Sequence, residues 1–331
     1  MIGTDQPVQN QRKTSFRDHH PEYPTGNPAD TTGDDDVILP NTPLDEAEQL
    51  AINYINLHKY CDNMLISNEQ LNENQVDSVV DQMLDCSISQ IISNEKPICP
   101  RFPREWSASE IVSEKNFTRT WARDVVEFID WCSRFPVFVQ LPYEDKITLF
   151  RSQFTQIALF DKCYRSYLEQ KPGLVLGNGN VFPRDEQMQS QIDNQQLRNM
   201  FSSLQNMLFN DVVYPMTYIR MNEAEYVLIK ANIFLAEGHH TINLSCAGRK
   251  LVETERERHR NAMYAKFDVL NPEPQAALHF AIQIEQMMNA TESAALQMDK
   301  SMQTLDMFKK NSQLRTLVQE CHMDKLQEMM E

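Results

Sequence analysis

Residues 129–154 read IDWCSRFPVFVQLPYEDKITLFRSQF, and two prolines divide this stretch into segments of different character. Pro136 ends the helix before it, because proline lacks a backbone N–H and disfavours helix in the preceding residue. Pro142 suits the first position of a new helix, and Glu144 and Asp145 follow in the turn where the helix dipole favours acids. The sequence therefore predicts two helices joined by a short, stiff, aromatic turn.

The helices on either side of this turn carry different patterns. A helix is predicted over residues 108–134, because Phe117, Trp121 and Phe128 recur at the spacing of one helical face. The following helix, over residues 143–169, is apolar on nearly all sides. A helix of that kind is buried all round, so it should lie in the middle of the protein.

The rest of the chain is mostly helical in pattern, so the predicted fold class is all-α. Residues 1–43 are the exception, since they are polar and rich in proline, glycine and aspartate, and they are interpreted as a disordered tail or hinge. Residues 173–182, GLVLGNGNVF, predict one small β-hairpin. Further helices are expected near residues 195–210, 222–236, 244–267 and 274–310.

Composition excludes several classes of protein. The 331 residues carry a formal net charge of −16, which argues against direct contact with nucleic acid, because such contact depends on clustered Lys and Arg. No segment approaches the roughly 18 uninterrupted apolar residues of a membrane span, and the N-terminus resembles no secretory signal. The seven cysteines are scattered and form no CxxC pair, so we expect an intracellular protein without a structural zinc site.

Residues 125–167, VVEFIDWCSRFPVFVQLPYEDKITLFRSQFTQIALFDKCYRSY, resemble the signature region of nuclear receptor ligand-binding domains. In that family a helix ends in a Phe/Ile-Pro turn, and the next helix opens with a Leu-Pro pattern and ends in Arg-Ser. The resemblance is closest over 117–166, extends weakly over about 45–331, and is of a divergent, nematode type. It implies a three-layer antiparallel helical sandwich over 44–331, with an internal pocket, no enzymatic activity and a location in the nucleus or cytoplasm.

The resemblance also implies a ligand site. Arg165 matches an arginine that faces the pocket, and Asp124 matches a carboxylate that works with it on a ligand hydroxyl. Because Asp124 interrupts an apolar stripe, the two are expected to form a pair, either for a ligand or to neutralise each other in a filled core. Lys162 matches a pocket position that is usually apolar. The other implied lining residues are Phe117, Trp121, Phe154, Ala158 and Leu176. The ligand would be a small lipophilic molecule such as a sterol or fatty acid, with no metal.

A second implied site is a groove for a short Leu-rich coregulator helix. Its positions on the central helices are Ile129, Ile147, Phe150 and Arg151. The family's charge-clamp lysine is replaced by Ser133, with Arg134 beside it, so a charge-assisted bond of about 1.5–3 kcal/mol is lost. Coactivator binding is therefore predicted to be weak or atypical, or replaced by corepressor binding. The implied activation helix, whose glutamate would cap the partner's helix, contains Leu326, Glu328, Met329 and Met330.

Three functions remain open on the sequence. The first is a ligand sensor of a transcription regulator, in which a ligand shifts the activation helix. The second is a ligand-independent interaction module with a filled pocket, which forms a homodimer or a heterodimer with another nuclear receptor through the 274–310 helix. These 331 residues contain no paired CxxC motifs of the family's DNA-binding module. The third, a thiol enzyme using Cys163, is disfavoured, because no histidine lies near it in sequence and its helix is expected to be buried.

Overall fold

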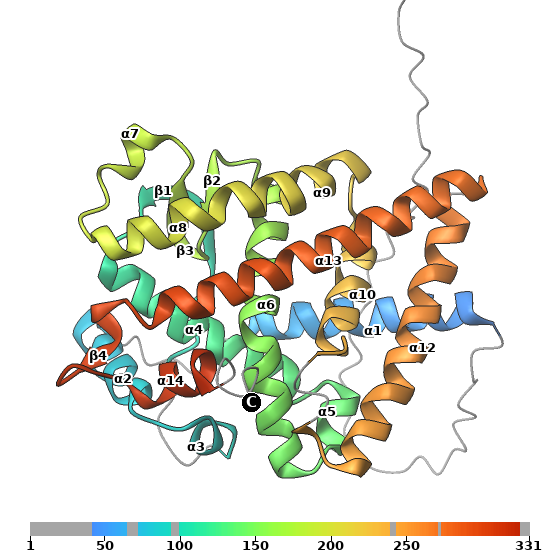
Figure 1. Ribbon diagram of the computed structural model, residues 1–331, viewed down its shortest axis with the longest axis horizontal. Coiled ribbons are helices and arrows are strands. Elements are labelled where there is room, and N and C mark those ends of the chain that lie inside the picture. Colours follow the sequence, from blue (N-terminus) through green and yellow to red (C-terminus); the bar gives the residue numbers. More distant parts are fainter. Residues whose placement is uncertain (1–41, 65–71, 94–98, 239–242, 271–272, 325–331) are drawn as a thin grey trace, which may run out of the picture. The chain divides into compact units, whose positions relative to one another are not determined.

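The computed structural model describes residues 42–64, 72–93, 99–238, 243–270 and 273–324, all within the unit Pro40–Glu331. The predicted tail, 1–43, therefore stays almost wholly a prediction. The helices are α1 (Pro43–Asn63), α2 (Glu73–Leu84), α3 (Ile88–Ile92), α4 (Glu114–Cys132), α5 (Pro136–Gln140), α6 (Tyr143–Glu169), α7 (Glu186–Gln189), α8 (Gln195–Leu208), α9 (Tyr214–Ile219), α10 (Glu223–Phe234), α12 (Cys246–Leu270), α13 (Pro274–Met302) and α14 (Thr316–His322) (Figure 1). The strands are β1 (Glu105–Ile111), β2 (Gly173–Val175), β3 (Asn178–Pro183), β4 (Lys309–Lys310) and β5 (Gln313–Leu314).

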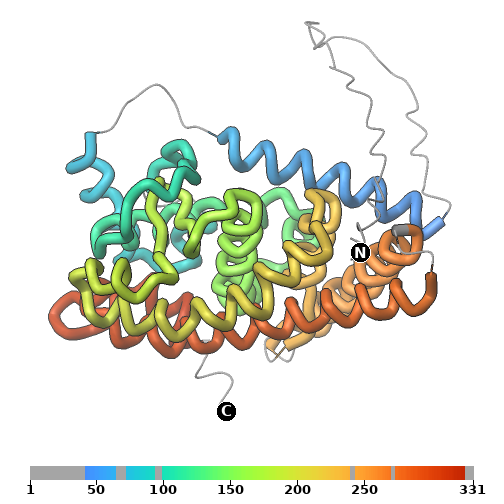
Figure 2. The backbone as a smooth tube through the Cα atoms, turned by 90° about the horizontal axis from the view of Figure 1, so that it is seen from above, coloured from blue at the N-terminus to red at the C-terminus, as the bar shows by residue number. Residues whose placement is uncertain are grey.

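Helix α6 occupies the middle of three helical layers, which confirms the predicted all-α sandwich. Figure 2 shows α6 between α1 on one side and α13 on the other. Helix α6 packs against α4, α10, α13 and α14, and α13 also packs against α8 and α12. A helix that is apolar on nearly all sides needs neighbours on all sides, and this position provides them.

The aromatic turn that follows α4 contains a short helix that the sequence did not predict. Helix α5 begins at Pro136, and Pro142 caps α6 rather than starting it. Phe135, at the corner, is fully buried and lies between three aromatic rings. Its centroid is 4.6 Å from that of Trp131, 5.0 Å from that of Phe234 and 5.1 Å from that of Tyr54. The two prolines therefore hold an aromatic cluster that joins α4 and α5 to α1 and α10.

The helix predicted over 108–134 is wrong at its start. Strand β1 pairs in parallel with β3, so the predicted hairpin is part of a three-stranded sheet in the order β1-β3-β2. Helix α4 begins only after Ser113, whose Oγ accepts a hydrogen bond from the Asn116 backbone N–H at 3.3 Å. Backbone pairing with β3 thus takes residues 108–111 out of the predicted helix.

The helix predicted over 274–310 is also too long, because α13 ends at Met302. Leu305 and Phe308 are fully buried, so the chain must turn back towards the core to place them. A second small hairpin, β4–β5, follows, and its loop residues Asn311 and Ser312 have φ of 51° and 66°. Positive φ at both central residues is the geometry of a tight two-residue hairpin. Helix α14 then packs against α6 and α13.

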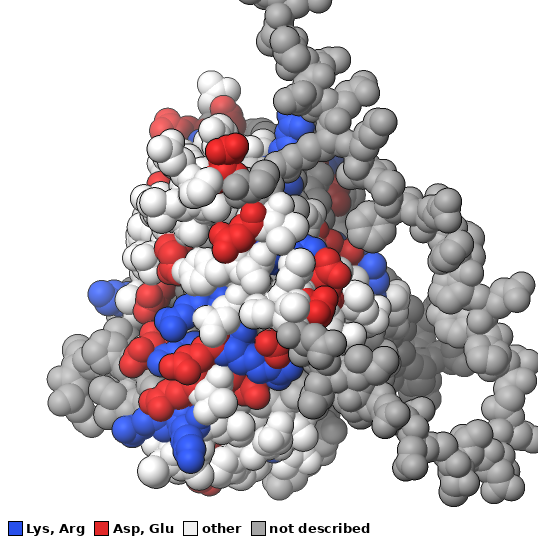
Figure 3. Space-filling model, turned by 90° about the vertical axis from the view of Figure 1, so that its right-hand side faces the viewer, with Lys and Arg blue, Asp and Glu red and all other residues white. Residues whose placement is uncertain are grey.

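Charged side chains of both signs are mixed on the side of the molecule that carries α12 (Figure 3). Arg258 forms ion pairs with Glu46 of α1 and with Glu255 at 3.1 Å, and Arg256 pairs with Glu237 at 3.0 Å. This is a solvated helix face rather than a patch of one sign. Within the described residues, no helix combines the length and apolar character needed to cross a membrane.

Candidate functional site

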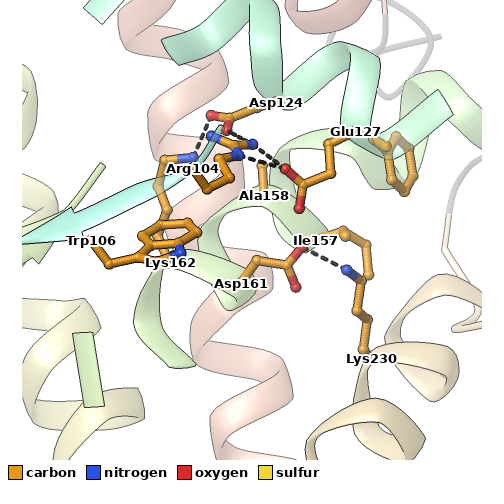
Figure 4. A pocket seen from close by; sticks show the side chains of 10 residues that line it. Arg104, Trp106, Asp124, Glu127, Ile157, Ala158, Asp161, Lys162 and Lys230 are labelled. Atoms are coloured by element: carbon orange, nitrogen blue, oxygen red, sulfur yellow. Dashed lines mark hydrogen bonds and ion pairs between the residues drawn. The ribbon is translucent and has the colours of Figure 1, made fainter. Parts of the chain in front are cut away.

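A buried set of charged residues lies between α4, α6 and the start of β1 (Figure 4). Lys162 Nζ donates a hydrogen bond to Asp124 Oδ2, and Arg104 Nη2 donates to Asp124 Oδ1 at 2.9 Å. Arg104 Nε also donates to Glu127 Oε2 at 2.7 Å. The four side chains form an alternating row, Lys162–Asp124–Arg104–Glu127, which we call the ion row. Its members surround a cavity of about 30 Å3 that Trp106, Phe128, Ile157, Ala158, Asp161 and Lys230 complete.

The ion row satisfies its own charges. Burial alone would lower the pKa of Arg104, but the neighbouring Glu127 and Asp124 carboxylates raise it well above its usual value. Burial would likewise raise the pKa of Glu127, but the positive charges of Arg104 and Arg123 bring it well below its usual value. Both groups therefore stay ionised despite their burial, because each has an opposite charge in contact.

The expected pair of Asp124 and Arg165 does not form. Arg165 Nη2 donates to Asp62 Oδ2 at 2.6 Å and lies 3.1 Å from His58 Nε2, so it contacts α1. Its guanidinium also lies 4.9 Å from the ring centroid of Trp106. Lys162, one turn earlier on α6, takes the position beside Asp124 that was expected for Arg165. Sequence reasoning missed Arg104, because this residue reaches the site only through the unpredicted strand β1. It also missed Glu127, which is a partner of Arg104.

The expected aromatic lining does come together, around a second cavity of about 20 Å3. Trp121 and Phe154 meet edge to face with centroids 6.0 Å apart, and Phe117 meets Phe201 at 5.4 Å. Leu176 is fully buried but lies outside the linings of both cavities. The remaining lining residues are Asp124, Thr155, Ala158, Leu159, Lys162, Met298 and His322. Cavities of this size hold one or two waters, whereas pockets for drug-sized ligands occupy roughly 300–1,000 Å3.

Beside this aromatic cluster lies a polar network that the sequence did not reveal. His322 Nδ1 is 2.7 Å from Asp299 Oδ1, and Thr155 Oγ1 donates to the same carboxylate at 2.6 Å. Trp121 Nε1 donates to His322 Nε2 at 3.0 Å. Trp121 stood out in the sequence only as an apolar position, and no local pattern marks Thr155, Asp299 or His322. The four residues lie on α4, α6, α13 and α14 and meet only in the folded chain.

The predicted coregulator positions lie on one region of α4 and α6. Phe150 is fully buried, Ile129 is 9% exposed, and Ile147 and Arg151 are partly buried. Ser133 Oγ donates to the Ile129 carbonyl at 2.6 Å, within its own helix. Arg134 lies over the Tyr60 ring at 4.5 Å and donates to its hydroxyl at 3.1 Å, so it is held against α1. Leu326, Glu328, Met329 and Met330 lie outside the described residues.

The cysteines offer little for thiol chemistry. All seven lie within the described residues and none forms a disulfide, and of these only Cys246 is exposed. Burial raises the pKa of the Cys163 thiol well above its usual value, so the reactive thiolate is disfavoured. This environment argues against the thiol enzyme considered above.

Comparison with known proteins agrees with this architecture. The family model for the ligand-binding domain of nuclear hormone receptors matches residues 104–323. The nuclear hormone receptor family member nhr-4 of Caenorhabditis elegans is 27% identical over 167 residues, 50% of this chain and 32% of that protein. Family member nhr-100 of the same organism is 25% identical over 182 residues, 54% of this chain and 41% of that protein.

A protein from Xenopus laevis is similar at a comparable level. Hepatocyte nuclear factor 4-beta of Xenopus laevis is 24% identical over 144 residues, 44% of this chain and 30% of that protein. The chain thus spans less than half the length of each of these relatives. The residues that the family model matches contain the aromatic turn, the ion row and the central helix α6. The chain therefore belongs to the nuclear hormone receptor ligand-binding domains, in a divergent form related to nematode receptors.

Proposed function

We propose that this domain regulates transcription in the nucleus through protein contacts, with its pocket filled by its own side chains. The observation that carries this proposal is the size of the two cavities at the expected ligand site, about 20 and 30 Å3. A sterol or fatty acid would have to displace the aromatic rings and separate the ion row. That separation would expose buried charges, which costs several kcal/mol when one partner is lost.

Two surfaces support the role in protein contacts. The first is the coregulator region of α4 and α6. The second is a surface depression of about 630 Å3 along α12 and α13, where Leu278 is 63% exposed and Ile282 is 45% exposed. Exposed apolar side chains gathered at a depression mark interaction sites. We propose that a second receptor domain, identical or different, packs against it, and that the 274–302 helix provides the dimer interface.

A ligand sensor is the second candidate, and one observation favours it. The two cavities share Asp124, Ala158 and Lys162, so polar and aromatic groups converge at one place, as they do in ligand sites. A small lipophilic ligand that joined the cavities would shift the C-terminal segment only if it bound one arrangement more tightly than the other.

Native mass spectrometry of the full chain tests the two candidates. We expect the bare mass for a filled domain. An adduct of a few hundred daltons that disappears on denaturation would overturn the filled-pocket proposal and support the sensor.

The variant Ala158→Phe provides a second test, because Ala158 lines both cavities. In a filled domain the larger ring overpacks the core and lowers the free energy of unfolding by about 1–3 kcal/mol. In a ligand-holding domain it removes the adduct, because the ring occupies the space of the ligand.

A further inference from the structure

Helix α3 is a short amphipathic helix with apolar side chains on one face. Ile88, Ile91 and Ile92 stand at positions i, i+3 and i+4, and the first two are each 1% exposed. A capping box fixes its first turn: Ser87 Oγ accepts from Gln90 N–H at 3.1 Å, and Gln90 Oε1 accepts from Ser87 N–H at 3.0 Å. A helix of five residues is too short to be stable alone, so its shape depends on what it packs against.

Helix α3 packs against α6 and α14, near the lower end of α6 in Figure 1. Tyr143, the first residue of α6, donates its hydroxyl hydrogen to the Ser89 carbonyl at 2.9 Å. On the other side, Glu320 of α14 accepts a hydrogen bond from the Ile88 backbone N–H at 2.7 Å through Oε2. The first orphan amide of α3 is therefore satisfied by a carboxylate from another element.

Helix α3 lies beside the part of the coregulator region that α6 provides. Tyr143, Ile147, Phe150 and Arg151 follow one another at spacings of four, three and one, so they share one face of α6. Tyr143 contacts α3 at Ser89. Glu320, which accepts the hydrogen bond from Ile88 N–H, is close enough to Arg151 for the positive charge of Arg151 to oppose the burial that raises the pKa of the Glu320 carboxyl. Helix α3 therefore lies against α6 between Tyr143 and Glu320, beside the face that carries Ile147 and Phe150.

We propose that α3 occupies, in cis, the surface that this domain offers to the amphipathic helix of a partner protein. The chemistry of the occupant defines the partner: a short helix with branched apolar side chains at i, i+3 and i+4, whose first backbone N–H donates to Glu320. Partner binding at this surface then requires α3 to leave, so the surface is closed to a partner helix in the arrangement described here. This inference rests on the proposed coregulator function, because it assigns the regulation of that same surface.

Peptide binding to the full chain tests the proposal. The probe is a fluorescein-labelled synthetic peptide of residues 85–93, and the test variant is Ile88→Asp/Ile91→Asp, which removes the apolar face of α3. We expect the variant to bind the peptide saturably and at least tenfold more tightly than the wild type does. Glu320→Gln added to the variant should weaken that binding several-fold, because the cap is lost. The matched control Ile52→Asp changes an exposed isoleucine on α1 and should behave as the wild type.

A second probe separates this proposal from the coregulator function. If an unrelated Leu-rich amphipathic peptide binds wild type and variant equally, the surface is open and the cis-occupancy proposal fails, while the coregulator function stands. If the 85–93 peptide binds the variant and the Leu-rich peptide binds neither, the occupancy stands and the coregulator function fails. A folded variant that binds neither peptide overturns the occupancy.

Hydrogen exchange on the wild type keeps the test valid if the variant does not fold. Saturating Leu-rich peptide should increase amide exchange across residues 88–92, because α3 is displaced, and should keep residues 143–151 protected. Bound peptide with unchanged exchange in α3 would overturn the proposal.

Discussion

His322 Nδ1 lies 2.7 Å from Asp299 Oδ1, and both side chains are fully buried. The indole N–H of Trp121 can only donate, so His322 Nε2 accepts that bond and the ring hydrogen is on Nδ1, directed at Asp299. Thr155 donates to the same carboxylate oxygen. Asp299 and His322 together thus hold α14, the last described helix, against α4, α6 and α13.

The first prediction concerns this carboxylate. Asp299→Ala should lower the free energy of unfolding by about 3 kcal/mol, because two buried donors, on His322 and Thr155, lose their acceptor. Urea unfolding followed by circular dichroism measures the change. Glu292→Ala, at an exposed position of the same helix, is the control and should change the value by less than about 0.5 kcal/mol. A loss below about 1 kcal/mol in Asp299→Ala would show that the network does not hold α14.

The second prediction concerns the buried contact of Lys162 with Asp124. A double-mutant cycle with Lys162→Met and Asp124→Asn should give a coupling energy of about 2 kcal/mol, because the side chains are each 10% exposed and in direct contact. The exposed pair Lys59–Glu223, 3.3 Å apart, is the matched control and should give less than about 1 kcal/mol. Equal coupling energies for the two pairs would contradict the description of the ion row as a buried unit.

The third prediction is a pH dependence from Glu127. Its pKa in the folded chain lies well below the ordinary 4.5, because the charges of Arg104 and Arg123 outweigh the effect of burial. A lowered folded pKa contributes stability that is fully present above the unfolded pKa and is lost as the pH falls towards the folded pKa. Wild type should therefore exceed Glu127→Gln in unfolding free energy most at neutral pH. Denaturant unfolding from pH 7 downwards should show this difference shrinking below pH 4.5, whereas a constant difference would exclude the mechanism.

The fourth prediction concerns the depression along α12 and α13. Leu278→Asp/Ile282→Asp should abolish the self-association, or the association with another receptor domain, that the wild type shows in sedimentation velocity. The reason is that two carboxylates replace the exposed apolar anchors of the proposed interface. Leu168→Asp changes a leucine that is 45% exposed on α6 and should leave association intact. Association that survives in the double variant would place the interface elsewhere.

Local signals predicted the part of the fold that depends on local chemistry. Pro136 and Pro142 fixed the aromatic turn, and the apolar run of residues 143–169 placed α6 in the centre. Strand β1 was not predictable in the same way, because its partner β3 lies about 70 residues further along the chain. The helix predicted over 108–134 was therefore too long.

The site shows the same limit. The interruption of an apolar stripe identified Asp124 as a candidate site residue. Periodicity, however, identifies the face of a helix without showing which residues lie opposite that face. Arg165 meets Asp62, which is 103 positions away, and Asp124 meets Arg104, which only the sheet brings near. The apolar spacing of Ile88, Ile91 and Ile92 was present in the sequence, but a five-residue helix is too short for periodicity to establish.

The covalent attachment of α3 determines how tightly a partner helix must bind to displace α3 from the surface that it occupies. A segment tethered this close has an effective concentration on the order of millimolar, whatever the amount of protein in the cell. A free partner helix present at micromolar concentration must therefore bind about a thousandfold more tightly than the contacts of α3 alone to take its place. Weak contacts made by five residues are thus enough to set a high minimum affinity for any partner helix. Lengthening the chain on either side of α3 would lower this minimum affinity without changing a single contact of α3.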